Sequence, residues 1–134
     1  LFGEHLLKKY PNKTVALVES EKTAIICSAL MPDYIWLATG GKSQFNERLK
    51  VLYGRDVVAF PDVDGYSTWC EKVKEFPDLK ISVSNLLQSN ATAEDMENHI
   101  DIADWLIRWK LQPETFETEK RNITFEKVKA FQVV

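Results

Sequence analysis

Three carboxylates follow short apolar runs in a pattern that suits magnesium-dependent chemistry on phosphate groups. Glu19 comes directly after residues 14–18, and Asp62 and Asp64 come after a similar run at 57–60. Parallel neighbouring strands would bring these acids together at the carboxyl edge of a sheet, where open α/β sheets bind ligands. Mg²⁺ takes a few carboxylates together with waters and phosphate oxygens. We therefore expect a Mg²⁺ or Mn²⁺ site formed by Glu19, Asp62 and Asp64.

Each of these acids also has a purely structural explanation. The segment Asp62-Val-Asp64-Gly65 has the composition of a polar turn after a strand. Glu19 precedes a helix start, where a negative charge complements the helix dipole. A lone Asp-x-Asp does not separate the two explanations. Acids at two independent strand ends favour the metal site.

Two further groups are candidates for contact with a substrate. Gly40 and Gly41, followed by Lys42, lie between a predicted strand and a predicted helix, so their N–H groups are able to approach a phosphate. This segment lacks the spacing of a nucleotide-binding P-loop, and a tight turn explains it equally well. Asp101 and Asp104 lie three residues apart at a helix start, where they either face the site or complement the dipole.

The elements that must position these residues alternate along the chain. Strands are predicted at residues 14–18, 34–38, 57–60 and 79–83. Helices are predicted at residues 2–10, 21–30, 44–53, 67–76 and 101–110, with another helix start at 91–95, where Thr92 is the N-cap. This order predicts an α/β fold with an open parallel sheet of about four strands. We expect one domain over residues 1–110 and a C-terminal extension or linker over 111–134.

Bulk properties limit the possible partners. The 134 residues carry a net charge of −3, with a pI of about 5.4, so nucleic-acid binding would need a local basic patch, a metal or other domains. No apolar run approaches the roughly 20 residues that span a bilayer. Cys27 and Cys70 are expected to be free thiols in a reducing compartment, which suggests the cytoplasm. The chain opens at Leu1, and we expect it to be a fragment of a larger protein.

The remaining aromatic and imidazole side chains carry no clear functional pattern. His5 and His99 have no acidic or metal-binding partner at a suggestive spacing, so capping or surface roles are expected for both. The four tryptophans fall mostly on apolar positions and are expected to pack in the core.

Four segments, in order, resemble motifs of the Toprim domain in primase-like proteins of phages and bacterial mobile elements. They are Val18-Glu-Ser-Glu-Lys-Thr-Ala24, Ala38-Thr-Gly-Gly41, Phe60-Pro-Asp-Val-Asp-Gly65 and Asp101-Ile-Ala-Asp-Trp-Leu106, and the resemblance spans about residues 14–107. Three positions depart from the family pattern. Ser20 replaces the usual glycine, Thr23 replaces a frequent acidic residue, and Pro61 directly before the aspartates is unusual.

The resemblance implies a Rossmann-like fold and a role in DNA processing. Asp62 and Asp64 would bind Mg²⁺, and Glu19 would be a metal ligand or a general acid/base. Lys22, Lys42 and Arg48 would contact phosphate, while Asp104 and Asp101 would support the site from outside. The implied partners are DNA, with nucleotides as possible substrates and other domains of the parent protein assisting. No membrane partner is implied.

Two other classes of function stay open. The chain is equally compatible with an inactive Toprim-like module that scaffolds partners or binds nucleic acid weakly. It is also compatible with an α/β phosphohydrolase that uses an Asp-x-Asp nucleophile. In that class the aspartates normally follow the first strand, whereas Asp62 follows the third predicted strand.

Overall fold

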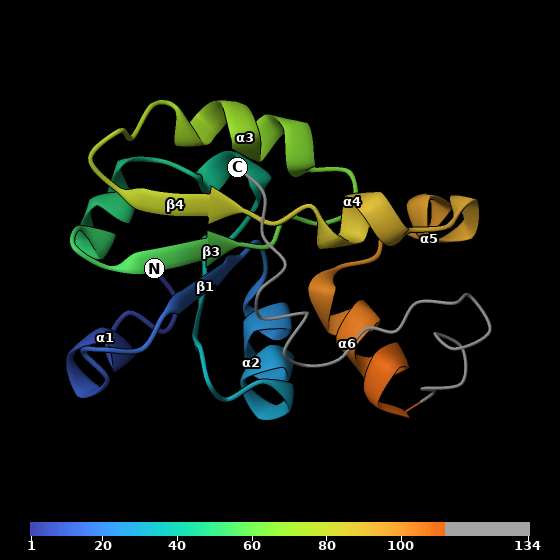
Figure 1. Ribbon diagram of the computed structural model, residues 1–134, viewed down its shortest axis with the longest axis horizontal. Coiled ribbons are helices and arrows are strands. Elements are labelled where there is room, and N and C mark those ends of the chain that lie inside the picture. Colours follow the sequence, from blue (N-terminus) through green and yellow to red (C-terminus); the bar gives the residue numbers. More distant parts are fainter. Residues whose placement is uncertain (112–134) are drawn as a thin grey trace.

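The fold is built on one open sheet of four parallel strands. The structure is a computed structural model that describes residues 1–111 (Figure 1). The spatial order is β2-β1-β3-β4, and every neighbouring pair is parallel. The strands are β1 (Val15–Val18), β2 (Ile35–Ala38), β3 (Asp56–Ala59) and β4 (Lys80–Val83). The predicted α/β class, with an open parallel sheet flanked by helices, is confirmed and is consistent with a Toprim-like or Rossmann-like fold.

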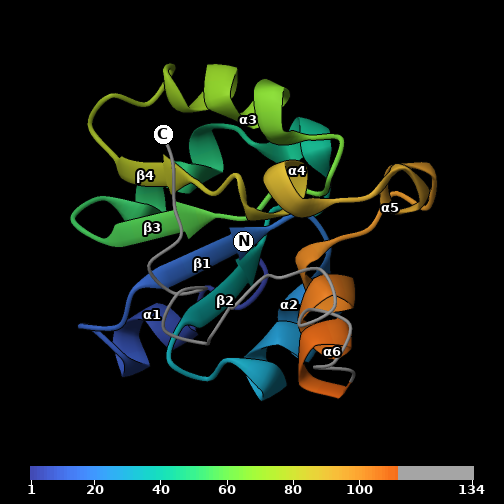
Figure 2. The same cartoon turned by 45° about the vertical axis from the view of Figure 1, so that its right-hand side comes forward.

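Helices cover both faces of the sheet. They are α1 (Leu6–Lys9), α2 (Glu21–Leu30), α3 (Tyr66–Val73), α4 (Leu86–Asn90), α5 (Ala93–Glu97) and α6 (Ile102–Leu111), with 3₁₀ segments η1 (Lys42–Gln44) and η2 (Glu47–Leu52). One face packs against α2, α4 and α6, and the other against α1, η2 and α3. Figure 2 shows α2 and α6 side by side on the first face.

The apolar runs become strands because both sides of the sheet are covered. All four residues of β1 and all four of β2 are buried. Strands of a doubly covered parallel sheet carry continuous rather than alternating apolar residues. The predicted core tryptophans are confirmed at Trp36, Trp69 and Trp105, which are at most 2% exposed. Cys27 is a buried free thiol and Cys70 is a half-buried one.

Helix α2 begins and ends where the sequence predicts. The side chain of Ser20 accepts a hydrogen bond from the backbone N–H of Thr23, which makes Ser20 the N-cap. The helix stops at Leu30, two residues before Pro32. Ser20, a departure from the Toprim pattern, therefore has a local structural role.

The predicted helix at 44–53 is wrong in type. The structure has the two short 3₁₀ segments η1 and η2 there. Asn46 interrupts the run, because its side chain accepts the N–H of Arg48 and starts a new segment. Leu49 and Leu52, both fully buried, are three residues apart, which is the repeat of a 3₁₀ helix.

Other predicted elements differ in extent. The predicted helix at 2–10 is reduced to α1, because Phe2 pairs with Ala38 in an antiparallel bridge beside the sheet. Gly3 turns the chain at φ 83°, and a Cβ atom there would lie 3.0 Å from the carbonyl oxygen of Trp36. Helix α4 was not predicted. The predicted C-terminal extension or linker lies, from residue 112 on, outside the described residues.

Arg55 joins the amino-terminal segment to the sheet. Its guanidinium donates to the carbonyl oxygens of Leu7, Tyr10 and Lys13, at 3.2, 2.7 and 3.1 Å. Two of these carbonyls lie in or at the end of α1, where intrahelical partners are missing.

Replacing Arg55 with methionine is expected to lower the free energy of unfolding by about 2 kcal/mol, since hydrogen bonds from charged donors are worth about 1.5–3 kcal/mol and the carbonyls would lose their partner. Urea denaturation followed by circular dichroism measures this change. Lys80→Met, at an exposed lysine, is the matched control and is expected to change stability by less than about 0.5 kcal/mol. An equal effect of both variants would contradict the role of Arg55.

No helix in residues 1–111 combines the length and the apolar character needed to cross a bilayer.

Candidate functional site

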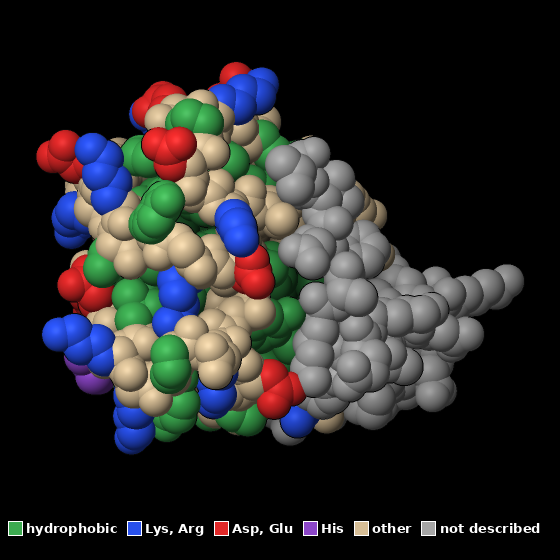
Figure 3. Space-filling model, turned by 60° about the vertical axis from the view of Figure 1, so that its left-hand side comes forward, with side chains coloured by type: hydrophobic (Ala, Val, Ile, Leu, Met, Phe, Trp, Pro, Cys, Tyr) green, Lys and Arg blue, Asp and Glu red, His purple; other side chains and the backbone are tan. Residues whose placement is uncertain are grey.

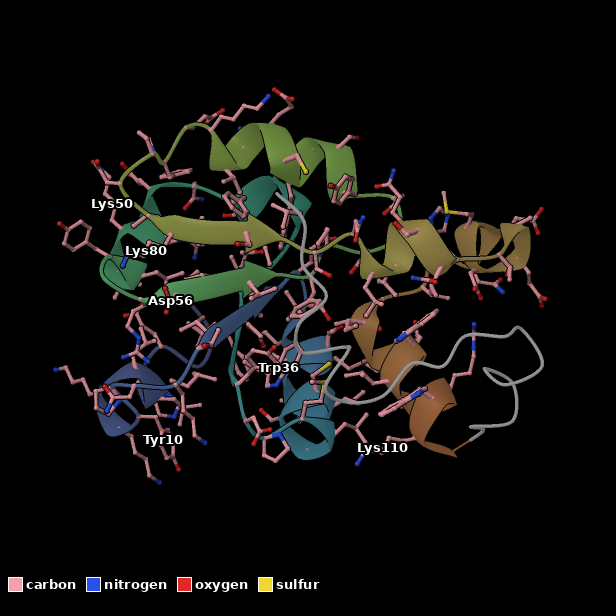
Figure 4. The ribbon with its side chains drawn as sticks, viewed as in Figure 1. Tyr10, Trp36, Lys50, Asp56, Lys80 and Lys110 are labelled. Carbon is pink, nitrogen blue, oxygen red and sulfur yellow. The ribbon has the colours of Figure 1, made fainter. Side chains whose placement is uncertain are left out.

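The strand order places the carboxyl ends of β1 and β3 next to each other. From β1 the chain continues to β2 on one side, and then crosses to β3 on the other side. This reversal is the topological switch point, where open α/β sheets form their ligand crevice. The strands run toward α4 and α5 in Figure 4, and Asp56 and Lys80 mark the opposite edge, where β3 and β4 begin.

Glu19 and Asp62 meet at this switch point. Glu19 directly follows β1 and is only 7% exposed. Its Oε2 atom accepts a hydrogen bond from the backbone N–H of Asp62 at 3.1 Å. Gly65 lies beside this contact, since a Cβ atom there would be in van der Waals contact with the same oxygen, at 3.4 Å. The Glu19 carboxylate, at the end of β1, is thereby hydrogen-bonded to the loop that follows β3.

Asp62 has the most strongly perturbed acidity of this group. Burial is the largest cause that raises the pKa of its carboxyl, to about 8. The negative charges of Glu19, Asp101 and Asp64 raise this pKa further, as does a hydrogen bond between the Asp62 and Glu19 carboxyl groups. Near neutral pH the metal-free protein therefore holds the Asp62 carboxyl mostly protonated. Such perturbed acids are typical of functional sites.

Asp64 lies at the exposed side of the same loop. Its Oδ2 atom is 3.3 Å from Nδ1 of His99, and the side chains are 41% and 71% exposed. His99 has φ 49°, and among the described residues no other non-glycine residue has positive φ. His99 is exposed, as the predicted surface role requires, and its acidic neighbour lies 35 positions away, where no sequence spacing would indicate it.

A backbone hydrogen bond joins the segment that carries His99 to the loop that carries Asp62 and Asp64, the aspartate loop. The N–H of Val63, between the two aspartates, donates to the carbonyl oxygen of Ile100 at 3.1 Å. Val63 and Ile100 are both buried. The segment 99–101 is therefore attached to the loop that carries Asp62 and Asp64.

Asp101 and Asp104 have different positions relative to this site. Asp101 caps α6, and the two residues exchange hydrogen bonds between side chain and backbone N–H at 2.9 and 3.0 Å. The other oxygen of Asp101 accepts the hydroxyl of Thr23 at 2.8 Å, and its charge acts on Asp62. The structure therefore places Asp101, more than Asp104, beside the predicted metal ligands.

The glycine loop, residues 39–41, directly follows β2 and is hydrogen-bonded to the end of β1. The N–H of Gly40 donates to the carbonyl oxygen of Glu19 at 2.8 Å, and the N–H of Gly41 donates to the hydroxyl of Thr39 at 3.3 Å. Both amides that we predicted to face a phosphate thus have partners within the protein. Gly40 adopts φ 97°, a left-handed conformation that glycine takes without steric cost, with open space where a Cβ would be.

The predicted basic contacts are spread around this edge. Lys22 is exposed in the first turn of α2. Lys42 begins η1, and its side chain is not among those that the structure describes. Arg48 donates to the carbonyl oxygen of Thr39 at 3.0 Å, so it supports the glycine loop.

The acids fit a hydrated Mg²⁺ ion better than a closed metal cage. Within residues 1–111, no three His, Cys, Asp or Glu side chains already form a metal-binding group. Mg²⁺ binds through one or two carboxylates and keeps several waters, so its site does not need such a group. The clustered charge around Asp62 is the kind of environment that a divalent cation relieves.

Sequence reasoning missed Thr23 and His99 as members of this region. Thr23 lies 78 positions from Asp101 and His99 lies 35 positions from Asp64. Neither pair has a local sequence pattern, so only the packing of α6 against α2 and of segment 99–101 against the β3 loop reveals them.

Part of the chain matches a known protein family. Residues 1–63 match a family described as a domain of unknown function (DUF6371). This match includes Glu19, the glycine loop and Asp62. The chain matches no curated protein and no solved structure.

Proposed function

We propose that this chain is a Mg²⁺-dependent Toprim-type domain that transfers phosphoryl or nucleotidyl groups on nucleic acid. It would belong to a primase-like or related DNA-processing protein of the cytoplasm and would need other domains of that protein for full activity. The observation that carries the proposal is the junction of Glu19 and Asp62 at the β1/β3 switch point.

The proposed ligands are Asp62 and Asp64, with Glu19 as a third ligand or as a general acid/base. A bound Mg²⁺ would supply charge neutralisation and orientation of a phosphate group. Glu19 holds the backbone of the aspartate loop, so it fixes Asp62 relative to β1. Asp101 is held by Thr23 and adds negative charge from outside.

Charge distribution supports assistance from other domains. On the face shown in Figure 3, which looks toward the starts of the strands and away from the candidate site, Lys and Arg side chains are interspersed with Asp and Glu over the described residues. A mixed surface of this kind gives little of the counterion release that drives binding to nucleic acid. The metal, Lys42 and the exposed side chain of Lys22 are the proposed local sources of affinity for phosphate.

Calorimetric titration with Mg²⁺ and Mn²⁺ tests the proposal. We expect binding in the millimolar range that is weakened at least about tenfold in the double variant Asp62→Asn with Asp64→Asn, because both proposed carboxylate ligands are lost. The matched control is Asp56→Asn, which changes an exposed aspartate at the other end of β3. The titration is repeated with a single-stranded oligonucleotide.

The outcomes separate the catalytic function from a scaffold. Binding that is lost only in the double variant supports the metal site and justifies assays of primer synthesis with the parent protein. No binding by the folded wild type, with or without oligonucleotide, would exclude the metal site. It would favour the inactive Toprim-like scaffold, for which the departures at Ser20 and Thr23 and the acidic pI are the supporting observations.

A further inference from the structure

We propose that the pocket between α1 and the end of η2 binds a nucleoside monophosphate, either free or at the end of a nucleic-acid strand. The pocket lies at the edge of the sheet where the strands begin, so it is separate from the switch point that holds Glu19 and Asp62 (Figure 1). The observations that carry this site are the size of the pocket, an exposed aromatic ring and two basic side chains without an acidic partner.

Arg55 joins the two walls of the pocket. It directly precedes β3, and its guanidinium donates to the carbonyl oxygen of Leu7 in α1 at 3.2 Å. One wall carries Leu7 and Lys8, and the other carries Val51 and Tyr53. The pocket has a volume of about 510 Å³, within the range of roughly 300–1,000 Å³ that is usual for small-molecule sites.

Tyr53 offers an unoccupied aromatic surface at this pocket. It is 73% exposed, more than any other large hydrophobic residue in the described part of the chain. No other ring within residues 1–111 packs against it. Its neighbour Val51 is also exposed. Exposed apolar side chains that gather at a cavity are typical of a ligand-binding groove.

The basic side chains give the pocket an excess of positive charge. Within residues 1–111, neither Lys8 nor Arg55 forms an ion pair. The carbonyl oxygens that bind Arg55 are neutral, so they do not cancel its charge. Glu4 and His5 complete the lining, and two cations against one acid leave the excess. The pocket therefore favours a ligand with an anionic group.

A nucleoside monophosphate combines the two features that the pocket offers. Its base would stack on the Tyr53 ring, because every nucleobase has a face that stacks on an aromatic side chain. Its phosphate would lie near Lys8 and Arg55, since both residue types bind phosphate. A long polyanion fits less well, because the face in Figure 3, at the starts of the strands, mixes Lys and Arg with Asp and Glu.

NMR titration of the nitrogen-15-labelled protein with AMP, without Mg²⁺, tests the site. We expect saturable shifts of the backbone amides of Lys8, Val51 and Tyr53, and weaker binding of adenosine, which lacks the phosphate. No saturable binding of AMP by the folded protein would overturn the proposal, as would shifts at Glu19 and Asp62 instead. Binding at this pocket in a protein that binds no Mg²⁺ would exclude the proposed metal site and support the nucleotide site.

Three variants separate stacking from charge. Tyr53→Ala is expected to weaken AMP binding about tenfold, and Tyr53→Phe, which keeps the ring, to match the wild type. Lys8→Met is expected to weaken AMP binding about threefold with little effect on adenosine. The matched control is Lys9→Met, at the next lysine of α1, which is exposed and does not line the pocket. Wild-type affinity in Tyr53→Ala, or equal losses in Lys8→Met and Lys9→Met, would overturn the proposal.

A short 5′-phosphorylated oligonucleotide distinguishes the two sources of the ligand. If it binds more tightly than AMP and loses affinity in the same variants, the site holds the end of a strand. If AMP binds more tightly, the site holds a free nucleotide.

Discussion

Replacing Asp62 with asparagine is expected to stabilise the metal-free protein while it removes stabilisation by Mg²⁺. Asp62 is half-buried. Burial, together with the neighbouring carboxylates, raises its pKa to about 8. When the pH is above the unfolded-state pKa of this carboxyl, folding costs free energy, because the fold disfavours the ionised form. Solvent screens part of the repulsion, so we expect a gain of about 2 kcal/mol near pH 8.

The sign of the pH dependence is specific. The folded-state pKa of Asp62 is raised, so its contribution is favourable to folding below the unfolded value of 3.8 and is lost as pH rises toward about 8. The advantage of Asp62→Asn should therefore vanish near pH 4 and be complete near pH 8. Urea denaturation at a series of pH values measures it.

Mg²⁺ should narrow the stability difference between the two proteins. A ligand that binds only the native state raises its stability by RT ln(1 + [L]/Kd). The wild type should gain stability in millimolar Mg²⁺ and Asp62→Asn should not. Asp56→Asn is again the matched control, and equal responses of all three proteins would contradict the metal site.

Replacing Asp95 with alanine is expected to lower the free energy of unfolding by about 3 kcal/mol. The Asp95 carboxylate is buried and accepts two hydrogen bonds from the guanidinium of Arg108, at 2.6 and 3.1 Å. It also closes a capping box with Thr92, whose predicted role as N-cap of this helix is confirmed. Removing one partner of a buried pair costs about 3–5 kcal/mol, and the partial exposure of Arg108 places this case at the lower end.

The effect should disappear in acid. The hydrogen bonds from Arg108 are the largest cause that lowers the pKa of Asp95. A lowered folded-state pKa gives stability that is present above the usual aspartate pKa and is lost as pH falls below it. Wild type and Asp95→Ala should therefore differ most near pH 7 and approach each other near pH 3. Glu97→Gln, at an exposed acid of α5, should change stability little, and an equal loss in this control would contradict the role of the pair.

The same pair bears on the site through segment 99–101. Ile100 hydrogen bonds to the carbonyl oxygen of Asp95, so α5 is directly attached to the segment that carries His99 and Asp101. If Asp95→Ala remains folded, a weaker affinity for Mg²⁺ than in Glu97→Gln would show that this attachment helps to form the site.

Local patterns in the sequence determined the elements of the fold. Continuous apolar runs predicted β1, β2 and β3, because strands buried on both sides need them. Thr92 predicted the start of α5, because capping depends on residues three positions apart. The alternation of strands and helices predicted a parallel sheet, and hence that the acids after β1 and β3 face one edge. The segment at 44–53 was misjudged, because helical spacing of apolar residues does not distinguish an α-helix from consecutive 3₁₀ turns.

Tertiary structure alone decided which distant residues meet. The order β2-β1-β3-β4 made β1 and β3 neighbours and brought Glu19 to Asp62. The contacts of Thr23 with Asp101, of His99 with Asp64 and of Asp95 with Arg108 join elements that have no shared local pattern. The pKa of Asp62 is likewise a property of the assembled site, since burial and neighbouring charges exist only after folding. Spacing along the chain determines secondary structure, whereas the electrostatics of a site depend on distances through space.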